Sequence, residues 1–245
     1  PIHQERKTNV SEYPLQAGSA QVVITPPLGV SMAGYYHDRR ADGVLDDLHA
    51  RALVLSDQTT SAALVVCDLI GLKREITSRI RARILQSTGI PETNTLICCT
   101  HTHTGPVTWS WTEAGLQPDQ AYLDVLARRV ADAVQLAYQR RRPATVHVGH
   151  GHVEGIGSNR RLWMRDGTLR TNPPFQSPDI VRPAGPIDPE LGIWMVRDAD
   201  DVPLALVNTY ALHPDQVGGT ALSADYGGFE ARLLQPGIFR LFQFY

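Results

Sequence analysis

Short apolar runs of strand length alternate along this chain with two stretches of helical periodicity, and this alternation restricts the possible folds more than any other feature. The runs lie at residues 20–24, 52–55, 62–67, 95–99, 146–153, 192–196 and 204–210. Strands that alternate with helices build layered folds in which helices cover a sheet. The polar turn at residues 56–61 joins two runs into a hairpin, which adds antiparallel neighbours. We therefore predict an α/β fold of the mixed α+β kind, with a layered, mixed β-sheet and flanking helices.

The sequence predicts two amphipathic helices. Residues 73–87 place three isoleucines on one helical face, and Gly89 then provides a stop signal. The second helix is expected to open at Pro118, with Asp119 in its first turn. Its apolar stripe consists of Tyr122, Leu126, Val130, Val134 and Ala137.

The remaining segments are interpreted from their composition. Residues 1–16 form a polar leader. Residues 165–190 are rich in proline and polar side chains, and we expect them to form a long irregular excursion. The sequence shows no convincing domain boundary between residue 17 and residue 245.

The charge and the apolar content exclude two classes of partner. A net charge of −2 over 245 residues argues against a nucleic acid, because phosphate groups would need a clustered basic face. The basic run at residues 140–142 lies at the end of a predicted helix, where cations complement the helix dipole. No apolar stretch approaches the roughly 20 residues of a membrane span, so no transmembrane segment is expected. Cys67, Cys98 and Cys99 lie within apolar runs and are interpreted as buried strand residues.

His101 and His103 follow an apolar strand run directly and precede Gly105 and Pro106, which force a turn. In an extended segment, residues two apart point to the same face, so both imidazoles could reach one point. Ligand sites in α/β proteins commonly form where strands end. Polar side chains are costly in a core, and this cluster of them favours a metal or catalytic site over a buried polar cluster.

Three further histidines must be distinguished from that pair. His150 and His152 repeat the two-residue spacing, but they sit inside a strand run, where one half-exposed face explains them. His213 follows a strand run and precedes a proline, so it too lies at a strand exit. A lone histidine in such a place is more often structural, but the parallel with His101 favours a shared site. We expect His101 and His213 to approach one another and His150 and His152 to lie apart.

Imidazole nitrogens suit Zn²⁺, which takes about four ligands and keeps one position open for water when it is catalytic. Two or three histidines from separate strand ends would need a carboxylate to complete the set. Asp68 and Asp225 are the local candidates, and each has an alternative role in a turn or a cap. The sequence thus predicts a zinc site and leaves its coordination sphere open.

Several motifs resemble those of the neutral/alkaline non-lysosomal ceramidase family, and they occur in family order over about residues 17–235. The most specific is His-Thr-His-Thr-Gly-Pro at residues 101–106. The others include Gly18-Ser19-Ala20, Met32-Ala33-Gly34-Tyr35, Asn159-Arg160-Arg161, Gly185-Pro186-Ile187-Asp188-Pro189-Glu190 and Tyr210-Ala211-Leu212-His213-Pro214. The resemblance implies a zinc hydrolase that cleaves the amide of N-acylsphingosine-like lipids into a fatty acid and a sphingoid base.

Carried over by motif, the resemblance makes His101 and His213 ligands of the zinc ion. It places His103 and Arg160 beside the metal, in contact with the substrate or the developing oxyanion, where a cation would stabilise the negative charge. The expected cofactor is therefore Zn²⁺, and the expected partner is a ceramide-like lipid amide.

The family completes its site with a carboxylate, a tyrosine and a serine in a glycine-rich loop, all after the matched region. The tail at residues 237–245 does not resemble the family's continuation. We therefore expect residues 17–245 to be a C-terminally truncated catalytic domain that is not by itself a competent amidase. Two alternatives stay open. One is a zinc amidohydrolase of small polar amides, which would use His101, His103, His213 and Asp225; the other is a non-catalytic remnant of the fold.

Overall fold

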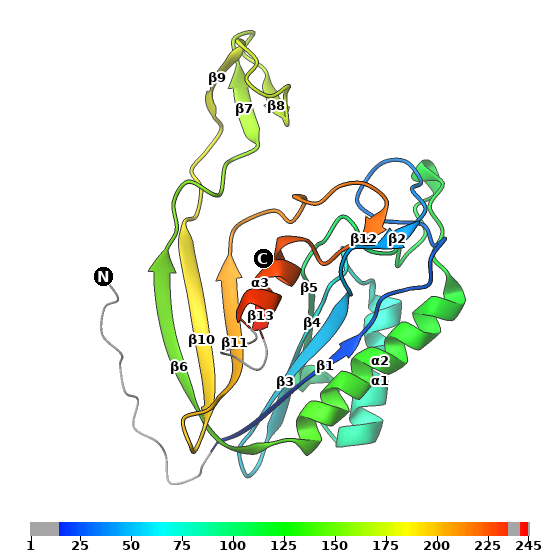
Figure 1. Ribbon diagram of the computed structural model, residues 1–245, viewed down its shortest axis with the longest axis vertical. Helices are drawn as coiled ribbons and strands as arrows, with labels where there is room; N and C mark the ends of the chain where they lie inside the picture. Colours follow the sequence, from blue (N-terminus) through cyan, green and yellow to red (C-terminus); the bar gives the residue numbers. More distant parts are fainter. Residues whose placement is uncertain (1–14, 235–240, 245) are drawn as a thin grey trace.

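One mixed sheet of eight strands organises the part of the chain that the computed structural model describes, residues 15–234 and 241–244 (Figure 1). Its strands are β1 (Gln16–Val23), β3 (His49–Ser56), β4 (Ser61–Cys67), β5 (Thr95–Cys99), β6 (Arg142–His152), β10 (Glu190–Asp198), β11 (Pro203–Tyr210) and β13 (Leu241–Phe244). Their spatial order is β13-β11-β10-β6-β1-β3-β4-β5. Only β4–β5 and β11–β13 pair in parallel; the other neighbours, including the predicted hairpin β3–β4, are antiparallel. The predicted mixed sheet is confirmed.

The sheet bends back on itself between β6 and β1, so that its two halves face each other (Figure 1). These two strands are joined by only two residue pairs, at Gln16 and Ala17, and the halves diverge from that corner. Side chains alternate across β3, as the period of two requires. Val54 packs against the helices, whereas Leu53 packs with Val207 of the opposite half. The fold therefore has three layers: helices, the half with β1, β3, β4 and β5, and the half with β6, β10 and β11.

Helices α1 (Arg74–Thr88) and α2 (Gln120–Gln139) form the outer layer. The predicted apolar faces of both are buried, and burial of each large apolar side chain contributes about 1.5–3 kcal/mol. The chain leaves α1 through Gly89, whose φ of 75° favours glycine. The second helix begins two residues after Pro118, because the Asp119 side chain accepts a hydrogen bond from the backbone N–H of Tyr122 and so caps it. A third helix, α3 (Asp225–Leu234), follows the short parallel pair of β2 (Gly43–Val44) and β12 (Ala221–Leu222).

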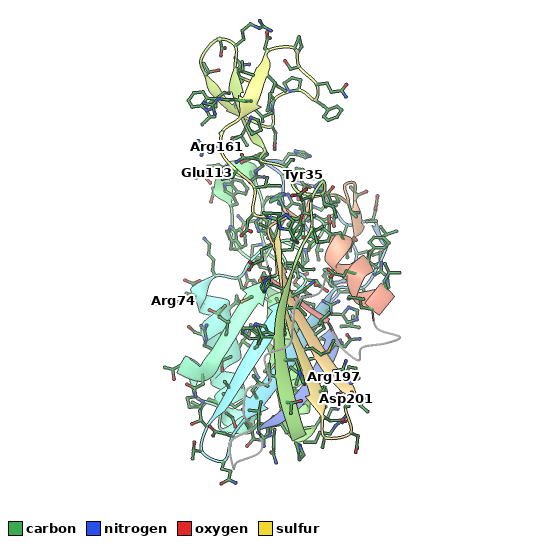
Figure 2. All side chains as sticks on the ribbon, turned by 90° about the vertical axis from the view of Figure 1, so that its left-hand side faces the viewer. Tyr35, Arg74, Glu113, Arg161, Arg197 and Asp201 are labelled. Atoms are coloured by element: carbon green, nitrogen blue, oxygen red, sulfur yellow. The ribbon has the colours of Figure 1, made fainter. Side chains whose placement is uncertain are left out.

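The irregular excursion expected at residues 165–190 carries two strands of a small separate sheet, whose first strand lies just before it. Strands β7 (Arg161–Met164), β8 (Leu169–Thr171) and β9 (Ile180–Pro183) pair antiparallel in the order β8-β7-β9. This sheet projects from the end of the large sheet, between β6 and β10 (Figures 1 and 2). The prediction was wrong here because such short strands bury almost no apolar surface, Met164 being the one buried apolar side chain among them. We call residues 154–189, which carry this sheet, the wing.

The cysteines agree only in part with the expectation of buried strand residues. Cys67 is fully buried, whereas Cys98 and Cys99 at the end of the edge strand β5 are half-buried. Burial raises the pKa of the Cys99 thiol to about 12. All three cysteines are free thiols. Among the described residues, no helix combines the length and the apolar character that a membrane crossing needs. Residues 1–14 of the expected leader lie outside the described part, and Gln16 already belongs to β1.

The backbone of β1 touches that of α2 at Gly18. A Cβ atom at this position would lie 2.1 Å from the carbonyl oxygen of Ala137 and 2.8 Å from the backbone nitrogen of Arg141. No real side chain tolerates such distances, and both neighbours are backbone atoms that cannot move aside. Gly18 therefore lets the helix layer approach the sheet.

We predict that Gly18→Ala lowers the free energy of unfolding by about 1–3 kcal/mol, because the added methyl forces the strand and the helix apart. Urea unfolding followed by circular dichroism measures the change. Gly149→Ala is the matched control, since a Cβ there would meet no atom within 4 Å. Equal stability of the two variants would show that the β1–α2 contact is not close-packed.

Candidate metal centre

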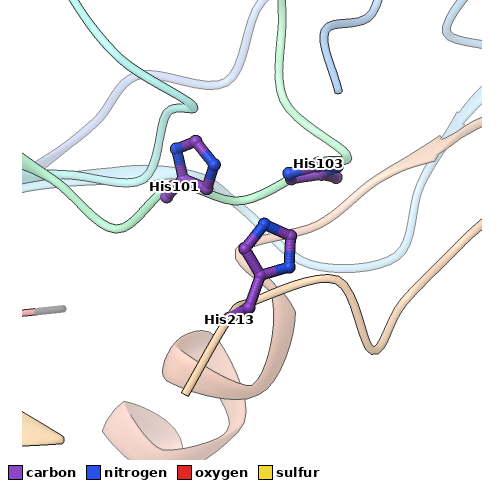
Figure 3. Close-up of side chains that lie close together, drawn as sticks. All are labelled: His101, His103 and His213. Atoms are coloured by element: carbon purple, nitrogen blue, oxygen red, sulfur yellow. The ribbon is translucent and has the colours of Figure 1, made fainter. Parts of the chain in front are cut away.

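Three histidines from two strand ends converge on one point (Figure 3). His101 and His103 follow β5, and His213 follows β11. Each offers a ring nitrogen within 4.8 Å of the others. The ring centroids of His103 and His213 are 4.6 Å apart, and those of His101 and His213 are 5.2 Å apart. The prediction that His101 and His213 approach one another is confirmed, and His103 joins them.

His101 is held by the loop that follows β4. Its backbone N–H donates to the carbonyl of Leu69 at 2.9 Å, and its ring Nδ1–H donates to the carbonyl of Ile70 at 2.8 Å. This second bond fixes the ring and its tautomer and leaves Nε2 with its lone pair toward the cluster. The backbone at His101 has a φ of 62°, so the segment turns here and is not extended as the two-residue spacing suggested. Such strained positions are frequent at functional sites.

The threonines of the His-Thr-His-Thr motif attach this loop to the chain that precedes α3. The hydroxyl of Thr102 donates to the carbonyl of Ser223 at 2.8 Å, and that of Thr104 donates to the same oxygen at 3.0 Å. Both threonines are fully buried. The Ser223 hydroxyl in turn donates to Asp46 at 2.6 Å. The motif therefore positions its histidines through its threonines.

His103 is only 9% exposed, and neither of its ring nitrogens has a hydrogen-bond partner in the described part. Buried polar atoms are rarely left unpaired, because each costs roughly 1–3 kcal/mol, so the vacant nitrogens fit a metal ion or a polar ligand. Gly34 packs against the ring: its φ is 110°, and a Cβ there would lie 2.7 Å from Cγ of His103. Arg39 donates to the carbonyl of His103 at 2.6 Å, a contact that the sequence did not predict.

The electrostatic surroundings favour neutral imidazoles. Burial lowers the pKa of His103, and the opposing charge of Asp215 offsets this only in part. Burial, followed by the positive charge of Arg160, lowers the pKa of His213. A neutral imidazole has the free lone pair that a metal ligand needs. His103 and His213 are therefore in the chemical state that suits a transition metal such as zinc before any ion arrives.

Asp225 positions the His213 loop and is not available as a ligand. One of its carboxylate oxygens accepts the backbone N–H groups of Gln216 at 3.0 Å and Val217 at 2.8 Å, and the other accepts that of Tyr226 at 2.6 Å. Asp225 is fully buried, with a strained φ of 57°. The Tyr226 hydroxyl also donates to the carbonyl of Leu212 at 3.0 Å. The start of α3 thus holds the loop on both sides of His213.

Asp68, the other candidate carboxylate, is also occupied. It forms a buried ion pair with Arg51 at 2.8 Å and accepts the backbone N–H of His49 at 2.9 Å. Another carboxylate does contact the cluster: Oδ1 of Asp215 lies 3.6 Å from Nδ1 of His103 and accepts the Tyr35 hydroxyl at 2.9 Å. Sequence patterns gave no signal for it beyond its place two residues after His213.

Arg160 lies at the foot of the wing, on the His213 side of the centre. The neighbouring Gly157 packs against the hydroxyl of Tyr210 and the carbonyl of Ala211, just before His213. The positive charge of Arg160 contributes to lowering the pKa of His213. That its guanidinium shares a cleft with His103 stays a prediction.

His150 and His152 lie apart from the centre, as predicted. Both belong to β6, and His152 contacts Glu154 at 2.9 Å. His150 lines a hollow of about 1340 Å³ between the two halves of the sheet, which contains none of the three clustered histidines. This larger hollow is therefore not the metal centre.

A small apolar pocket of about 150 Å³ adjoins the centre. His101 and His103 form part of its wall. The rest is mainly aromatic and aliphatic: Tyr36, Ile70, Val107, Trp109, Trp111 and Leu116. The centre thus combines polar nitrogens with an apolar surface at contact distance.

Comparison with known proteins identifies the same region. The profile of the family described as "Neutral/alkaline non-lysosomal ceramidase, N-terminal" matches residues 15–235. The neutral ceramidase of Mycobacterium tuberculosis is 25% identical over 215 residues, which is 82% of this chain and 32% of that protein. The neutral ceramidase of Pseudomonas aeruginosa is 23% identical over 212 residues, 82% of this chain and 30% of that protein. The chain therefore spans about a third of the length of these relatives.

Two solved structures share the fold. The crystal structure of the Pseudomonas aeruginosa neutral ceramidase superposes with a TM-score of 0.75 at 18% identity, covering 95% of this chain and 38% of that one. A ceramidase complexed with C2 gives a TM-score of 0.74 at 19% identity, covering 95% and 37%.

We predict that Asp225→Asn raises the dissociation constant for Zn²⁺ by about 10–100-fold, because residues that hold a ligand in place act on metal affinity to that extent. In this variant the side-chain amide would place an N–H group against the backbone N–H groups that the Asp225 carboxylate accepts, and this repulsion would loosen the His213 loop. Competition with a chromogenic zinc chelator measures the affinity.

Glu75→Gln, an equally conservative change at an exposed position of α1, is the control for this test. Urea unfolding of both variants separates a local effect from a loss of the fold. A well-folded Asp225→Asn protein with unchanged zinc affinity would contradict the positioning role.

Proposed function

The chain belongs to the neutral/alkaline non-lysosomal ceramidase family. We propose that it takes part in the zinc-dependent hydrolysis of the amide bond in ceramide-like lipids. The products would be a fatty acid and a sphingoid base. The observation that carries the proposal is the convergence of His101, His103 and His213 from two distant strand ends. These residues belong to the motifs that resemble the family.

In this proposal His101 and His213 hold the ion, and the ring of His101 presents Nε2 because Nδ1 is bonded to the Ile70 carbonyl. Bound Zn²⁺ supplies Lewis-acid polarisation of the amide carbonyl and of a water molecule. The ring nitrogens of His103 have no hydrogen-bond partner, and in this proposal His103 faces the carbonyl oxygen of the amide as that oxygen gains negative charge. Arg160 approaches from the His213 side and adds a positive charge.

The neighbouring pocket supports a lipid amide over a small polar amide. Trp109, Trp111 and Leu116 line it beside the two histidines of the motif, and such a surface favours a hydrocarbon chain. The polar-amide alternative also relied on Asp225 as a ligand, and the carboxylate of Asp225 is already bonded to three backbone N–H groups. The convergence of the three imidazoles and the lowered pKa values of His103 and His213 likewise argue against a non-catalytic remnant.

Zinc titration and a hydrolysis assay test the proposal together. We expect native mass spectrometry to find one Zn²⁺ per chain. His101→Ala and His213→Ala should each weaken zinc binding by at least about 100-fold, because too few protein ligands remain for a defined site. An equal loss in His103→Ala would make His103 a third ligand. Failure of the chain to bind zinc would contradict the proposal.

The hydrolysis assay uses a fluorescent N-acylsphingosine and a short, polar N-acyl amine. It compares the chain with a longer in-frame protein that supplies the family's carboxylate, tyrosine and serine. We expect zinc-dependent cleavage of the lipid amide by the longer protein and a rate lower by orders of magnitude in the shorter chain. Equal rates would place the whole site within these residues, and preference for the polar amide would favour the alternative substrate.

Replacing Arg160 by lysine should lower turnover in the active protein by about 10–100-fold, because an ammonium group cannot reproduce the planar guanidinium fork. Its unfolding free energy should not change, since Arg160 is exposed. Arg161→Lys, one residue further along and also exposed, is the matched control. Unchanged turnover in Arg160→Lys would exclude Arg160 from the mechanism.

A further inference from the structure

The wing joins the large sheet through a neck, at which β6 ends and β10 begins (Figure 1). The last residue of β6 is His152 and the first of β10 is Glu190, and the antiparallel register places these two directly opposite each other. One more hydrogen bond, from the backbone N–H of Val153 to the carbonyl of Pro189, continues the pairing into the wing. The two ends of the wing therefore lie side by side at this neck.

Four side chains of the kinds that bind transition metals lie at the neck, and they are His150, His152, Glu154 and Glu190. The two histidines are two residues apart in β6, so they point to the same face of the sheet. Glu190 shares that face, because directly opposite residues of an antiparallel pair lie together on one side. His150 and Glu190 both line the large hollow between the halves of the sheet. Glu154 already contacts His152, with Oε1 and Nε2 2.9 Å apart.

The register of β6 and β10 brings these side chains within reach of one ion. Directly opposite residues in antiparallel strands have Cβ atoms about 4.5–5.5 Å apart, and diagonal neighbours lie roughly 7–8 Å apart. Glu190 is the direct neighbour of His152 and the diagonal neighbour of His150. Gly192 lies opposite His150 and has no side chain to stand beside that imidazole. Both imidazoles and the carboxylate can therefore turn toward a common point above the two strands.

The exposure of the four residues determines how tightly they would bind a metal. All four are exposed. Among the described residues, only the three histidines of the metal centre already hold their ligand atoms within 4.8 Å of one another. The side chains at the neck must therefore rotate to meet at an ion, and the rotational entropy that they lose weakens binding. We expect the neck to take an ion only at zinc concentrations above those that fill the metal centre.

We propose that His150, His152, Glu154 and Glu190 form a second site for Zn²⁺ or a similar divalent transition-metal ion, separate from the metal centre. Imidazole and carboxylate groups are both accepted by zinc, and four protein ligands make a closed, structural site without an open position for chemistry. The ligands come from both ends of the wing, so the bound ion clamps the neck. This site does not depend on the proposed hydrolysis.

Calorimetric titration with zinc in a His101→Ala/His213→Ala double variant isolates the second site, because the metal centre has lost two of its histidines. We expect one residual, weaker binding event. Adding His152→Ala or Glu190→Gln should each weaken that event by at least about tenfold, because a ligand is lost. Adding His147→Ala is the matched control: His147 is exposed on the same strand, and its odd-numbered position places it on the opposite face.

Limited proteolysis with trypsin measures the clamp on the wing, which carries exposed arginines at positions 165, 170 and 182. Excess zinc should slow cleavage there severalfold in the double variant, because an ion that binds the closed neck opposes its opening. Adding His152→Ala should abolish this protection, and adding His147→Ala should preserve it.

Absence of zinc binding in the double variant overturns the proposal, as does an equal loss of affinity in the His147→Ala control. Unchanged affinity in Glu190→Gln would confine the ion to β6 and overturn the clamp, as would cleavage that zinc does not slow. All of these measurements are made without an intact metal centre. A negative result therefore leaves the proposed hydrolysis standing, and failure of the hydrolysis assay leaves a positive result at the neck standing.

Discussion

Two buried threonine hydroxyls join the two halves of the metal centre. Thr102 and Thr104 both donate to the carbonyl of Ser223, which ties the loop after β5 to the chain that enters α3. Asp225, two residues further on, then holds the loop that carries His213. The position of the two histidine loops relative to each other therefore depends on a seam of hydrogen bonds between segments that are more than a hundred residues apart in the sequence. Within the first loop, the carbonyls of Leu69 and Ile70 also hold His101. His101, His103 and His213 all lie outside the helices and strands, so hydrogen bonds of this kind have to hold them.

The seam also accounts for the strain at the site. His101 and Asp225 both have left-handed backbone conformations, which cost of order 1 kcal/mol for residues with a side chain. Side-chain hydrogen bonds of each residue to the backbone offset that cost. Burial, meanwhile, keeps His103 and His213 neutral. A centre arranged in this way would bind a metal ion without having to reorganise its ligands.

Sequence patterns predicted seven strands of the large sheet, α1, α2 and the convergence of the histidines, but neither α3 nor the contacts that hold the histidines. Periodicity reveals which residues share a face of one element, so the strands, the hairpin and the apolar faces of α1 and α2 could be predicted. It carries no information about contacts between distant segments, which is why Asp225 was considered a ligand and Asp215 and Arg39 were not considered at all. The three strands of the wing were not predicted, because they are short and have almost no buried face. The bend between β1 and β6, with only two residue pairs, leaves no signature in either strand.

The central claim is that the three histidines form one zinc centre, and X-ray absorption at the zinc edge of the loaded chain tests it most directly. The account predicts a first shell of nitrogen and oxygen at about 2.0–2.1 Å, with the outer-shell scattering of at least two imidazoles. In His213→Ala that imidazole scattering should decrease, although the other histidines remain. A shell with sulfur at about 2.3 Å, or a spectrum that His213→Ala leaves unchanged, would contradict it.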